Sequence, residues 1–592
     1  MFLKIKLLLT LTTISFVVNG NYSIYTSSGI TEGELNGKVI SWHDIPYAQP
    51  PIGELRWKAP KELISPKLSI EPRDNNFCIQ KTSSLGGSSE FSDESISGTE
   101  DCLYLDIFAP KNNSKDPLPI MFWIHGGGNT SGLKDLYEFN KMVEKHEVII
   151  VRINYRLGPF GWFTHPAIQD LQDGIDKTSN FGTLDIIAAL GWVQKNISLF
   201  GGDPNNVTIF GESAGGHNVY SLIVSKNAKG LFHKAIAMSG YTTSTSPQNA
   251  YKQDTDSATS DYTSWEVVNK LIKGDQEKIG KKEIRDILLN ISAEDFFKIY
   301  EDRESYQELP LLTSDGIVIP SIGLRDSLQN KDFVNNVPLI SGSNADEVKL
   351  WLSSAEYFVD LDYSFIGSIL GIPKVELRDE DAFEAFNYYR SSAWKIRGVD
   401  FPLQSLSKAG NNKLYSYRYD WDDHRRFIVG DFKKLIGAAH ATEIPLLAGN
   451  SKLVGGFPLS TLIYPPSPSK RYVSKNMMKF WSNFAKYGSP GSSTNSINWE
   501  PYDPDSASPE FIILDEKDNL KMSNTKNSFK SLSEELYIDT RVNDLEKCVI
   551  LLQMFTFVGD DLYDQNINHY PGECDRLESE KFIRDNASFI EY

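Results

Sequence analysis

The chain has 592 residues, of which 40% are hydrophobic, and it carries a formal net charge of −18 with an isoelectric point near 5.1. This hydrophobic content excludes an intrinsically disordered chain and provides for a large buried core. The acidic balance repels the phosphates of nucleic acids and of anionic lipids, so we expect no nucleic-acid partner.

The N-terminus has the pattern of a secretory signal peptide. Two lysines precede an apolar run at residues 7–18, and Asn19 and Gly20 follow it. The run is too short for a typical membrane span, although an uncleaved anchor is the alternative. We expect a signal peptide at 1–20 and a single mature domain at 21–592 with no membrane span. The C-terminus has no retention signal, so the protein is expected outside the cell or in an endomembrane lumen.

Cysteines and glycosylation motifs agree with a secretory route. Four cysteines behind a signal peptide predict two disulfides. Three pairings are open, and the simplest joins the close pairs Cys78–Cys102 and Cys548–Cys574. No Cys/His spacing typical of zinc occurs. Asn-X-Ser/Thr motifs predict N-glycosylation at five positions, Asn112, Asn196, Asn206, Asn290 and Asn586.

Short β-branched runs alternate with helical patterns along the chain. Buried strands are predicted at 120–124, 148–153, 207–210, 235–238, 337–343, 414–421 and 511–514, and an amphipathic helix is predicted at 184–200. Strands without polar alternation, separated by helices, indicate an α/β fold with a mostly parallel sheet covered on both faces. The segments at roughly 241–329 and 351–400 are predicted to be helical insertions over one end of that sheet.

The stretch "VTIFGESAGG" places one serine between two glycines where a predicted strand ends. A G-x-S-x-G turn between a strand and a helix exposes the serine hydroxyl at the carboxyl end of the sheet. The amino terminus of the following helix favours negative charge at that point. Ser213 is therefore a candidate nucleophile, and an incidental serine in a tight turn is the alternative.

A second glycine motif, "WIHGGGN", follows the strand predicted at 120–124. Consecutive glycines let backbone N–H groups approach a substrate carbonyl closely. Together with the N–H of Ala214, they can form an oxyanion hole for acyl transfer. A flexible turn is the alternative for this motif alone.

A serine nucleophile needs a general base and an acid that orients it, and in this kind of fold they follow the serine in the order acid, then histidine. Among the downstream histidines, His424 lies in the charged stretch "DWDDHRRF" and is expected at the surface, and His569 lies near the chain end. His440 has small neighbours in "GAAHATE" and is the preferred base. Asp346 and Glu347 both follow a predicted strand, and spacing does not choose between them.

The motifs now extend far enough to show a family resemblance. "SGTEDCLYLDIFAP", "NYRLGPFGWF", "NFGTLDIIAALGWVQKNISLFGGDPNNVTIFGESAGG", "GSNADE", "GAAHATEIPLLAG" and "MMKFWSNFAKYGSP" occur in this order. In these stretches the chain resembles the type-B carboxylesterase family, which includes the cholinesterases, over nearly the whole mature sequence. The resemblance implies an α/β-hydrolase fold with a mostly parallel, mixed central sheet.

The resemblance also assigns roles to individual residues. It implies Ser213 as nucleophile, His440 as general base, Glu347 rather than Asp346 as the acid, and oxyanion donors at Gly127, Gly128 and Ala214. It implies the disulfide Cys78–Cys102, whereas Cys548–Cys574 has no clear counterpart. The expected activity is hydrolysis of small carboxylic esters through an acyl-enzyme, without metal or organic cofactor.

Three departures from the family pattern bear on function. Val348 stands where the family usually has glycine after the acid, and the loop between Cys78 and Cys102 contains no tryptophan. Cholinesterases hold choline on such a tryptophan, so choline esters are not expected as preferred substrates. A second loop disulfide of many relatives is also missing. The alternative function is a catalytically weak or inactive, cholinesterase-like adhesion or structural protein on the same fold.

Overall fold

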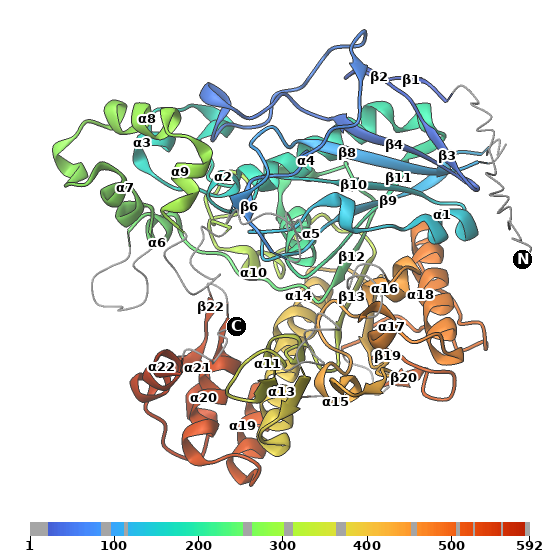
Figure 1. The fold of residues 1–592 in the computed structure, drawn as a ribbon, viewed down its shortest axis with the longest axis vertical. Coiled ribbons are helices and arrows are strands. Elements are labelled where there is room, and N and C mark those ends of the chain that lie inside the picture. The colour runs from blue at the N-terminus through green and yellow to red at the C-terminus, as the bar shows by residue number, and fades with distance from the viewer. Residues whose placement is uncertain are drawn as a thin grey trace, which may run out of the picture.

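A large mixed sheet forms the centre of the molecule. The computed structural model describes residues 22–83, 96–111, 116–252, 263–300, 312–362, 374–451, 459–504, 510–524, 527–557 and 560–586. The predicted signal peptide and the glycosylation motif at Asn112 lie outside these ranges. Within them the central sheet has 11 strands (Figure 1).

The order of the strands agrees with an α/β-hydrolase. From one edge to the other the strands are β3 (Glu34–Asn36), β4 (Val39–Pro46), β8 (Tyr104–Pro110), β10 (Ile149–Ile153), β9 (Leu118–Ile124), β11 (Gly202–Glu212), β12 (Lys234–Met238), β13 (Leu339–Asn344), β16 (Leu414–Tyr419), β19 (Phe511–Leu514) and β20 (Lys521–Ser523). Every neighbouring pair from β10 to β19 is parallel, and the outer pairs are antiparallel. All seven predicted strands are confirmed, and their carboxyl ends meet at one edge of the sheet.

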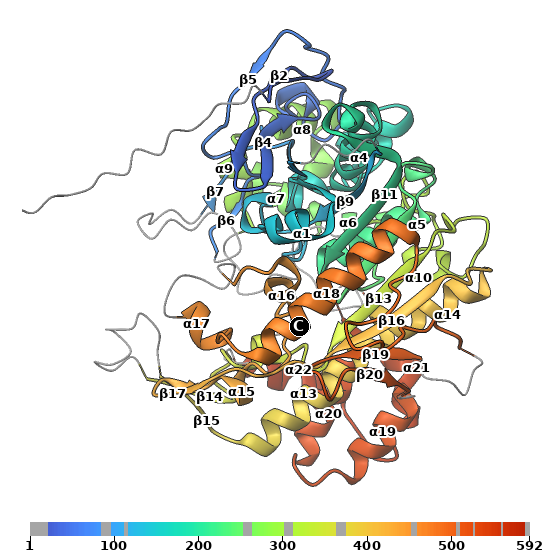
Figure 2. The same cartoon turned by 90° about the vertical axis from the view of Figure 1, so that its right-hand side faces the viewer.

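Alternating side chains of the strands divide the core into two layers. In β9, Ile120, Phe122 and Ile124 belong to one buried cluster, whereas Met121 and Trp123 belong to the other. The first cluster packs under α4 (Phe181–Asn196), α5 (Ala214–Val224) and α14 (Phe401–Lys408). The second packs under α1 (Asn140–His146), α16 (Ile444–Ala448) and α18 (Pro468–Tyr487), and Figure 2 shows α18 crossing this face. Helices therefore cover both faces, as predicted.

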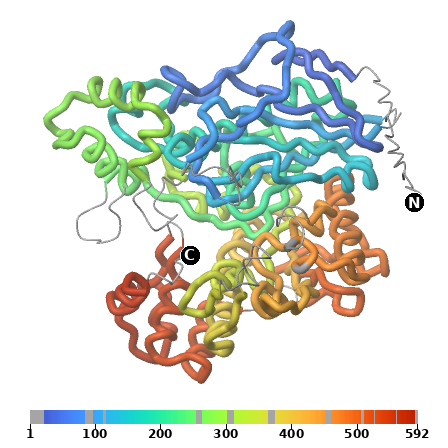
Figure 3. Tube along the Cα trace, in the orientation of Figure 1, coloured from blue at the N-terminus to red at the C-terminus, as the bar shows by residue number. Residues whose placement is uncertain are grey.

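Two further groups of helices flank the sheet. The first consists of α6 (Pro247–Tyr251), α7 (Ser264–Ile272), α8 (Lys281–Asn290) and α9 (Ala293–Lys298). The second consists of α13 (Glu380–Lys395) with the C-terminal helices α19 (Phe529–Ile538), α20 (Asp544–Phe555), α21 (Tyr563–Asn566) and α22 (Arg576–Asp585). Figure 3 shows the C-terminal segment in red folding back beside the yellow segment that contains α13. The domain boundaries given above stay a prediction.

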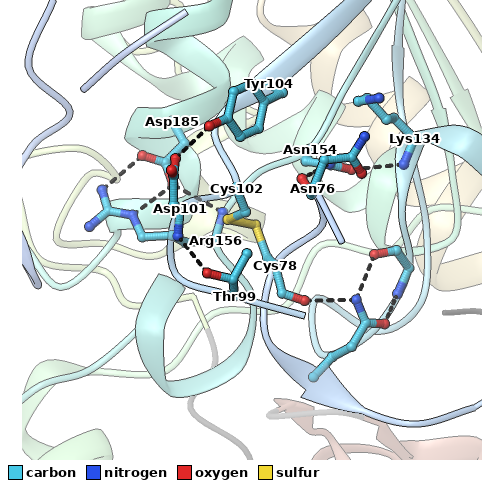
Figure 4. The surroundings of a disulfide bond; sticks show 12 residues. Asn76, Cys78, Thr99, Asp101, Cys102, Tyr104, Lys134, Asn154, Arg156 and Asp185 are labelled. Atoms are coloured by element: carbon cyan, nitrogen blue, oxygen red, sulfur yellow. Dashed lines mark hydrogen bonds and ion pairs between the residues drawn. A yellow bond between two sulfur atoms is a disulfide. The ribbon is translucent and has the colours of Figure 1, made fainter. Parts of the chain in front are cut away.

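Both disulfides join the cysteines that are close in sequence, Cys78 with Cys102 and Cys548 with Cys574. The first is surrounded by buried polar contacts (Figure 4). Beside it, Arg156 forms a two-pronged ion pair with Asp185 on α4, with nitrogen–oxygen distances of 2.8 and 2.7 Å. Within the disulfide loop, the Gln80 side chain donates to the carbonyl of Gly132 and accepts its N–H, which ties this loop to the segment that follows β9.

The structure corrects one of the predicted glycosylation sites. Asn196 is buried, and its Nδ2 donates to Ser27 Oγ and to the carbonyl of Trp192. A glycan on this nitrogen is incompatible with the fold, because the packing of α4 leaves no space for it. Asn290 is exposed, whereas Asn206 and Asn586 are half-buried. In the part of the chain that the structure describes, no helix is both long and apolar enough to span a bilayer.

The second disulfide gives a test of how the C-terminal helices are held. The sequence separation of Cys548 and Cys574 is 26 residues, and a loop of this size corresponds to about 3 kcal/mol in the chain-entropy model. We expect the double variant Cys548→Ala/Cys574→Ala to lose protection from hydrogen exchange in α20, while β9 and β11 keep theirs. Unchanged protection in α20 would show that packing alone holds this segment.

Candidate active site

The predicted nucleophile lies on a strained turn at the carboxyl end of β11. Ser213 has φ 59° and ψ −123°, a backbone conformation that residues other than glycine rarely adopt. It is held there because its N–H donates to the carbonyl of Met238 on β12 and its carbonyl accepts the N–H of His217 on α5. The hydroxyl consequently stands at the start of α5, as expected of a nucleophile elbow.

The two glycines of this turn are required by close backbone contacts. A Cβ atom on Gly215 would lie 2.1 Å from the carbonyl oxygen of Ile124, and one on Gly211 would lie 2.6 Å from the same oxygen. Both distances are far shorter than van der Waals contact. The turn therefore packs directly against the end of β9, from which the second glycine motif begins.

The predicted oxyanion loop lies against the same turn. Gly127 and Gly128 have φ of 98° and 63°, and a Cβ atom on Gly126 would lie 3.1 Å from the Cβ of Ser213. The hydrogen bonds found among the described residues use neither the N–H groups of Gly127 and Gly128 nor that of Ala214. Three backbone donors near the serine thus remain available for a substrate oxygen.

Glu347 and His440 form a short polar contact. The Glu347 Oε2 atom lies 2.6 Å from His440 Nδ1, and both side chains are almost completely buried. The other oxygen of Glu347 accepts the backbone N–H of Asn344, and its backbone carbonyl accepts the N–H of His440. This arrangement fixes the ring and places the proton of a neutral imidazole on Nδ1.

Asp346, the second candidate for the acid, has a different partner. Its Oδ2 atom accepts the backbone N–H of Ala438, and its Oδ1 accepts an N–H of the Asn387 amide. Asp346 therefore holds the loop that carries His440 and does not contact the imidazole.

The prediction for His424 is wrong. This histidine is buried, and its two ring nitrogens contact the carbonyl oxygens of Ile463 and Gly437. It supports the loop just before His440. The surrounding aspartates and arginines in the sequence suggest a solvated residue, but the ring turns inward, as does that of Trp421 in the same stretch.

The remaining nitrogen of His440 faces the residue before the predicted nucleophile. Its Nε2 atom lies 3.1 Å from Glu212 Oε1, without the alignment of a hydrogen bond, and both atoms lack a hydrogen-bond partner among the described residues. The structure thus brings His440 to the turn of Glu212 and Ser213, but the Nε2 contact is made by the glutamate. A hydrogen bond from Ser213 to Nε2 is absent from the contacts of the described residues.

Comparison with known proteins identifies the family. The sequence profile of the Carboxylesterase family matches residues 21–365 and 385–532. The chain belongs to the carboxylesterase family. It is 31% identical over 505 residues to para-nitrobenzyl esterase of Bacillus subtilis (strain 168), covering 83% of this chain and 94% of the relative. It is 31% identical over 517 residues to liver carboxylesterase of Sus scrofa, covering 80% and 87%.

Solved structures support the same fold. A para-nitrobenzyl (PNB) esterase structure matches with a TM-score of 0.64 and 27% identity, covering 86% of this carboxylesterase and 98% of the solved chain. Family and fold together make the protein a carboxylic-ester hydrolase of the α/β-hydrolase fold. The alternative of an inactive adhesion protein is not favoured.

Three buried glutamates surround the imidazole of this carboxylesterase. Burial by itself lowers the pKa of His440, but the negative charges of Glu212 and Glu347 outweigh burial and raise that pKa to about 9. Burial raises the pKa of Glu212 to about 7. Glu443, one turn after the histidine, is also buried, and burial together with the other two carboxylates raises its pKa to about 8. The neighbouring carboxylates therefore favour the charged form of the imidazole.

Sequence reasoning missed Glu443 and two tryptophans. Glu443 is held by the Asn344 side chain at 2.6 Å. The rings of Trp351 and Trp394 lie 5.1 and 4.8 Å from the His440 ring, measured between centroids. An acidic residue inside the apolar stretch "HATEIPLLAG" was the one available signal for Glu443. The tryptophans come from separate helices, so no local pattern predicts their contact.

These charges predict a shift in the pH dependence. A general base works in its neutral form, so kcat/KM rises with pH as His440 loses its proton. The carboxylate of Glu212 is the largest influence that raises the pKa of His440. We expect Glu212→Gln to lower this pKa and to move the acidic limb of the kcat/KM profile to lower pH by about one unit or more. The exposed Glu277→Gln variant serves as the control, and an acidic limb that is identical in both variants would contradict this assignment.

Proposed function

We propose that this carboxylesterase hydrolyses its substrates through a triad of Ser213, His440 and Glu347. One observation carries the proposal. The 2.6 Å contact of Glu347 with Nδ1 leaves Nε2 of His440 directed at the turn that bears Ser213. The order of the three residues along the chain and the strained elbow support it as well.

In the proposed first step, the imidazolium first passes its Nε2 proton to the Glu212 carboxylate beside it, and the neutral imidazole then turns from Glu212 and accepts the Ser213 proton on Nε2. The serine oxygen attacks the ester carbonyl at the same time. Glu347 keeps the ring oriented and stabilises the imidazolium that forms. The tetrahedral oxyanion accepts hydrogen bonds from the N–H groups of Gly127, Gly128 and Ala214, and the amino terminus of α5 adds favourable charge.

In the following steps, His440 donates its proton to the leaving alcohol and the acyl-enzyme remains on Ser213. Water then attacks the acyl carbonyl, and His440 again accepts and returns a proton. Glu212 stabilises the imidazolium in the resting enzyme, because the two groups are buried side by side. Its contact with Nε2 must break before Nε2 can accept the serine proton in each turnover. Glu212 therefore influences the fraction of enzyme molecules in which His440 can act as a base.

We further propose that the mature protein begins near residue 21 and enters the secretory pathway. The lysine-flanked apolar run at the N-terminus and the two disulfides support this route. Of the glycosylation motifs within the described residues, Asn290 is the most accessible acceptor, since it is exposed on α8.

Three variants test the triad: one of the serine, one of the proposed acid, and one of the neighbouring acid as a control. We expect Ser213→Ala to lower kcat on a short-chain aryl ester by roughly 10⁵-fold or more. We expect Glu347→Gln to lower it by roughly 10⁴-fold, because the neutral amide no longer stabilises the imidazolium.

Asp346→Asn is the control for Glu347→Gln, because it also neutralises an acid in this loop, one that is half-buried and has other partners. It should retain most of the wild-type kcat. A large loss in Asp346→Asn with near-normal activity in Glu347→Gln would contradict the assignment of the acid, and an active Ser213→Ala would contradict the nucleophile.

A further inference from the structure

The oxyanion loop (residues 126–132) packs on the nucleophile turn at its first glycine. A Cβ atom on Gly126 would lie 2.7 Å from the carbonyl oxygen of Glu212. Gly128 differs, because a Cβ atom there would have Thr130 Oγ1, at 3.5 Å, as its nearest neighbour outside the adjoining residues in the part of the chain that the structure describes. Glycine also restricts the backbone least of all residues. The N–H groups of Gly127 and Gly128 therefore need an anchor beyond Gly126.

Asn129, the next residue, is held at a sharp bend of the chain. Its φ is 60°, in the left-handed region that asparagine adopts more readily than most residues with a side chain. The residue is buried, with 4% of its surface exposed, and its carbonyl accepts the N–H of Gly158 at 2.7 Å. The backbone of Asn129 is thus fixed, and its amide is enclosed by protein.

The amide of Asn129 joins the oxyanion loop to α5, the helix that follows the nucleophile. Its Oδ1 atom accepts a hydrogen bond from Asn218 Nδ2 at 2.8 Å and a longer one from the Tyr155 hydroxyl at 3.3 Å. Its Nδ2 atom lies 3.4 Å from His217 Nδ1. His217 and Asn218 belong to α5, whose first residue, Ala214, bears the third backbone donor. One side chain therefore connects the two parts of the proposed oxyanion hole.

The protonation of His217 makes this connection specific for an amide. Burial lowers the pKa of His217 to about 4, so the imidazole is neutral at physiological pH. Its Nε2 donates to the carbonyl of Thr243 at 2.8 Å, which leaves Nδ1 as an acceptor. The amide of Asn129 can donate to this nitrogen and accept from Asn218 at the same time. A carboxylate in the same place would instead present oxygen lone pairs to the acceptor nitrogen.

We propose that Asn129 is a positioning residue of the oxyanion hole. Its amide sets the N–H groups of Gly127 and Gly128 relative to that of Ala214 on α5, so that all three donate to the same substrate oxygen. This inference rests on the proposed function, in which Ser213 attacks the ester carbonyl beside these donors. Because the negative charge on that oxygen develops in the transition state, loss of the amide is expected to lower kcat more than it changes KM.

The test removes the amide without straining the backbone, because glycine accepts the positive φ of this position. We expect Asn129→Gly to lower kcat on a short-chain aryl acetate by about 10²-fold, as the loss of an oxyanion donor does, with KM changed by less than about threefold. An alkyl trifluoromethyl ketone, which forms a tetrahedral oxyanion on the serine, should bind more weakly by a similar factor. Its inhibition constant does not depend on the amount of folded enzyme, so a loss of stability alone would leave it unchanged.

Two control variants match the two effects of this substitution. Asn75→Gly makes the same change at an exposed asparagine with φ 56°, and it tests the backbone effect. Asn411→Ala removes a buried amide that donates to the carbonyl of Val337, two residues before β13 begins, and therefore at the opposite end of the strands from the nucleophile. Both controls should keep the wild-type kcat and the wild-type inhibition constant.

Asn218→Ala removes the partner of the amide on α5 and leaves the oxyanion loop intact, so it carries the test if Asn129→Gly does not fold. We expect it to lower kcat and to weaken the ketone by about tenfold. Wild-type kcat and inhibition constants in every folded variant of Asn129 or Asn218 would overturn the role of Asn129 while ester hydrolysis stands. Absence of aryl acetate hydrolysis in wild type, or full activity of Ser213→Ala, would instead overturn the proposed function and this inference with it.

Discussion

The contact between Glu347 and His440 is the interaction on which the rest of the site depends. It joins two residues that are 93 positions apart and holds a buried imidazole in one orientation. Burial alone would favour a neutral ring, yet the carboxylates on its two sides keep it charged. The loop around it is fixed by further buried groups, with Asp346 on the backbone of Ala438 and His424 on that of Gly437. The position of His440 is thus fixed by buried hydrogen bonds, because water does not reach these polar groups to replace their partners.

The sheet converts this contact into a candidate catalytic arrangement. Parallel strands β9, β11 and β13 end at the same edge, so the glycine loop, the serine turn and the acid converge there. Close backbone packing leaves no room for side chains at Gly211 and Gly215, which forces the strained conformation of Ser213. In the resting geometry Nε2 of His440 lies 3.1 Å from Glu212 Oε1 and has no hydrogen bond to Ser213 among the described residues, and the Glu212 carboxylate favours the imidazolium over the neutral base.

Much of this could be predicted from local sequence, because buried parallel strands are short apolar runs and the elbow has a fixed glycine spacing. All seven predicted strands are present, and the family resemblance selects Glu347, the residue that contacts His440 in the structure, over Asp346. Features created by packing between distant segments were not predictable. His424 turns inward from a charged stretch, Asn196 is buried by Ser27 and α4, and the ring of Phe557 reaches that of Trp394 only because the C-terminal segment folds back.

The most direct test of this account is covalent labelling by a fluorophosphonate, followed by mapping of the modified peptide. We predict a single adduct on Ser213 in wild type, with labelling slowed by orders of magnitude in His440→Ala and in Glu347→Gln, because the serine then lacks an oriented base. An adduct on another residue, or equally fast labelling of Ser213 in the His440→Ala variant, would contradict the claim that the pair of Glu347 and His440 activates this serine.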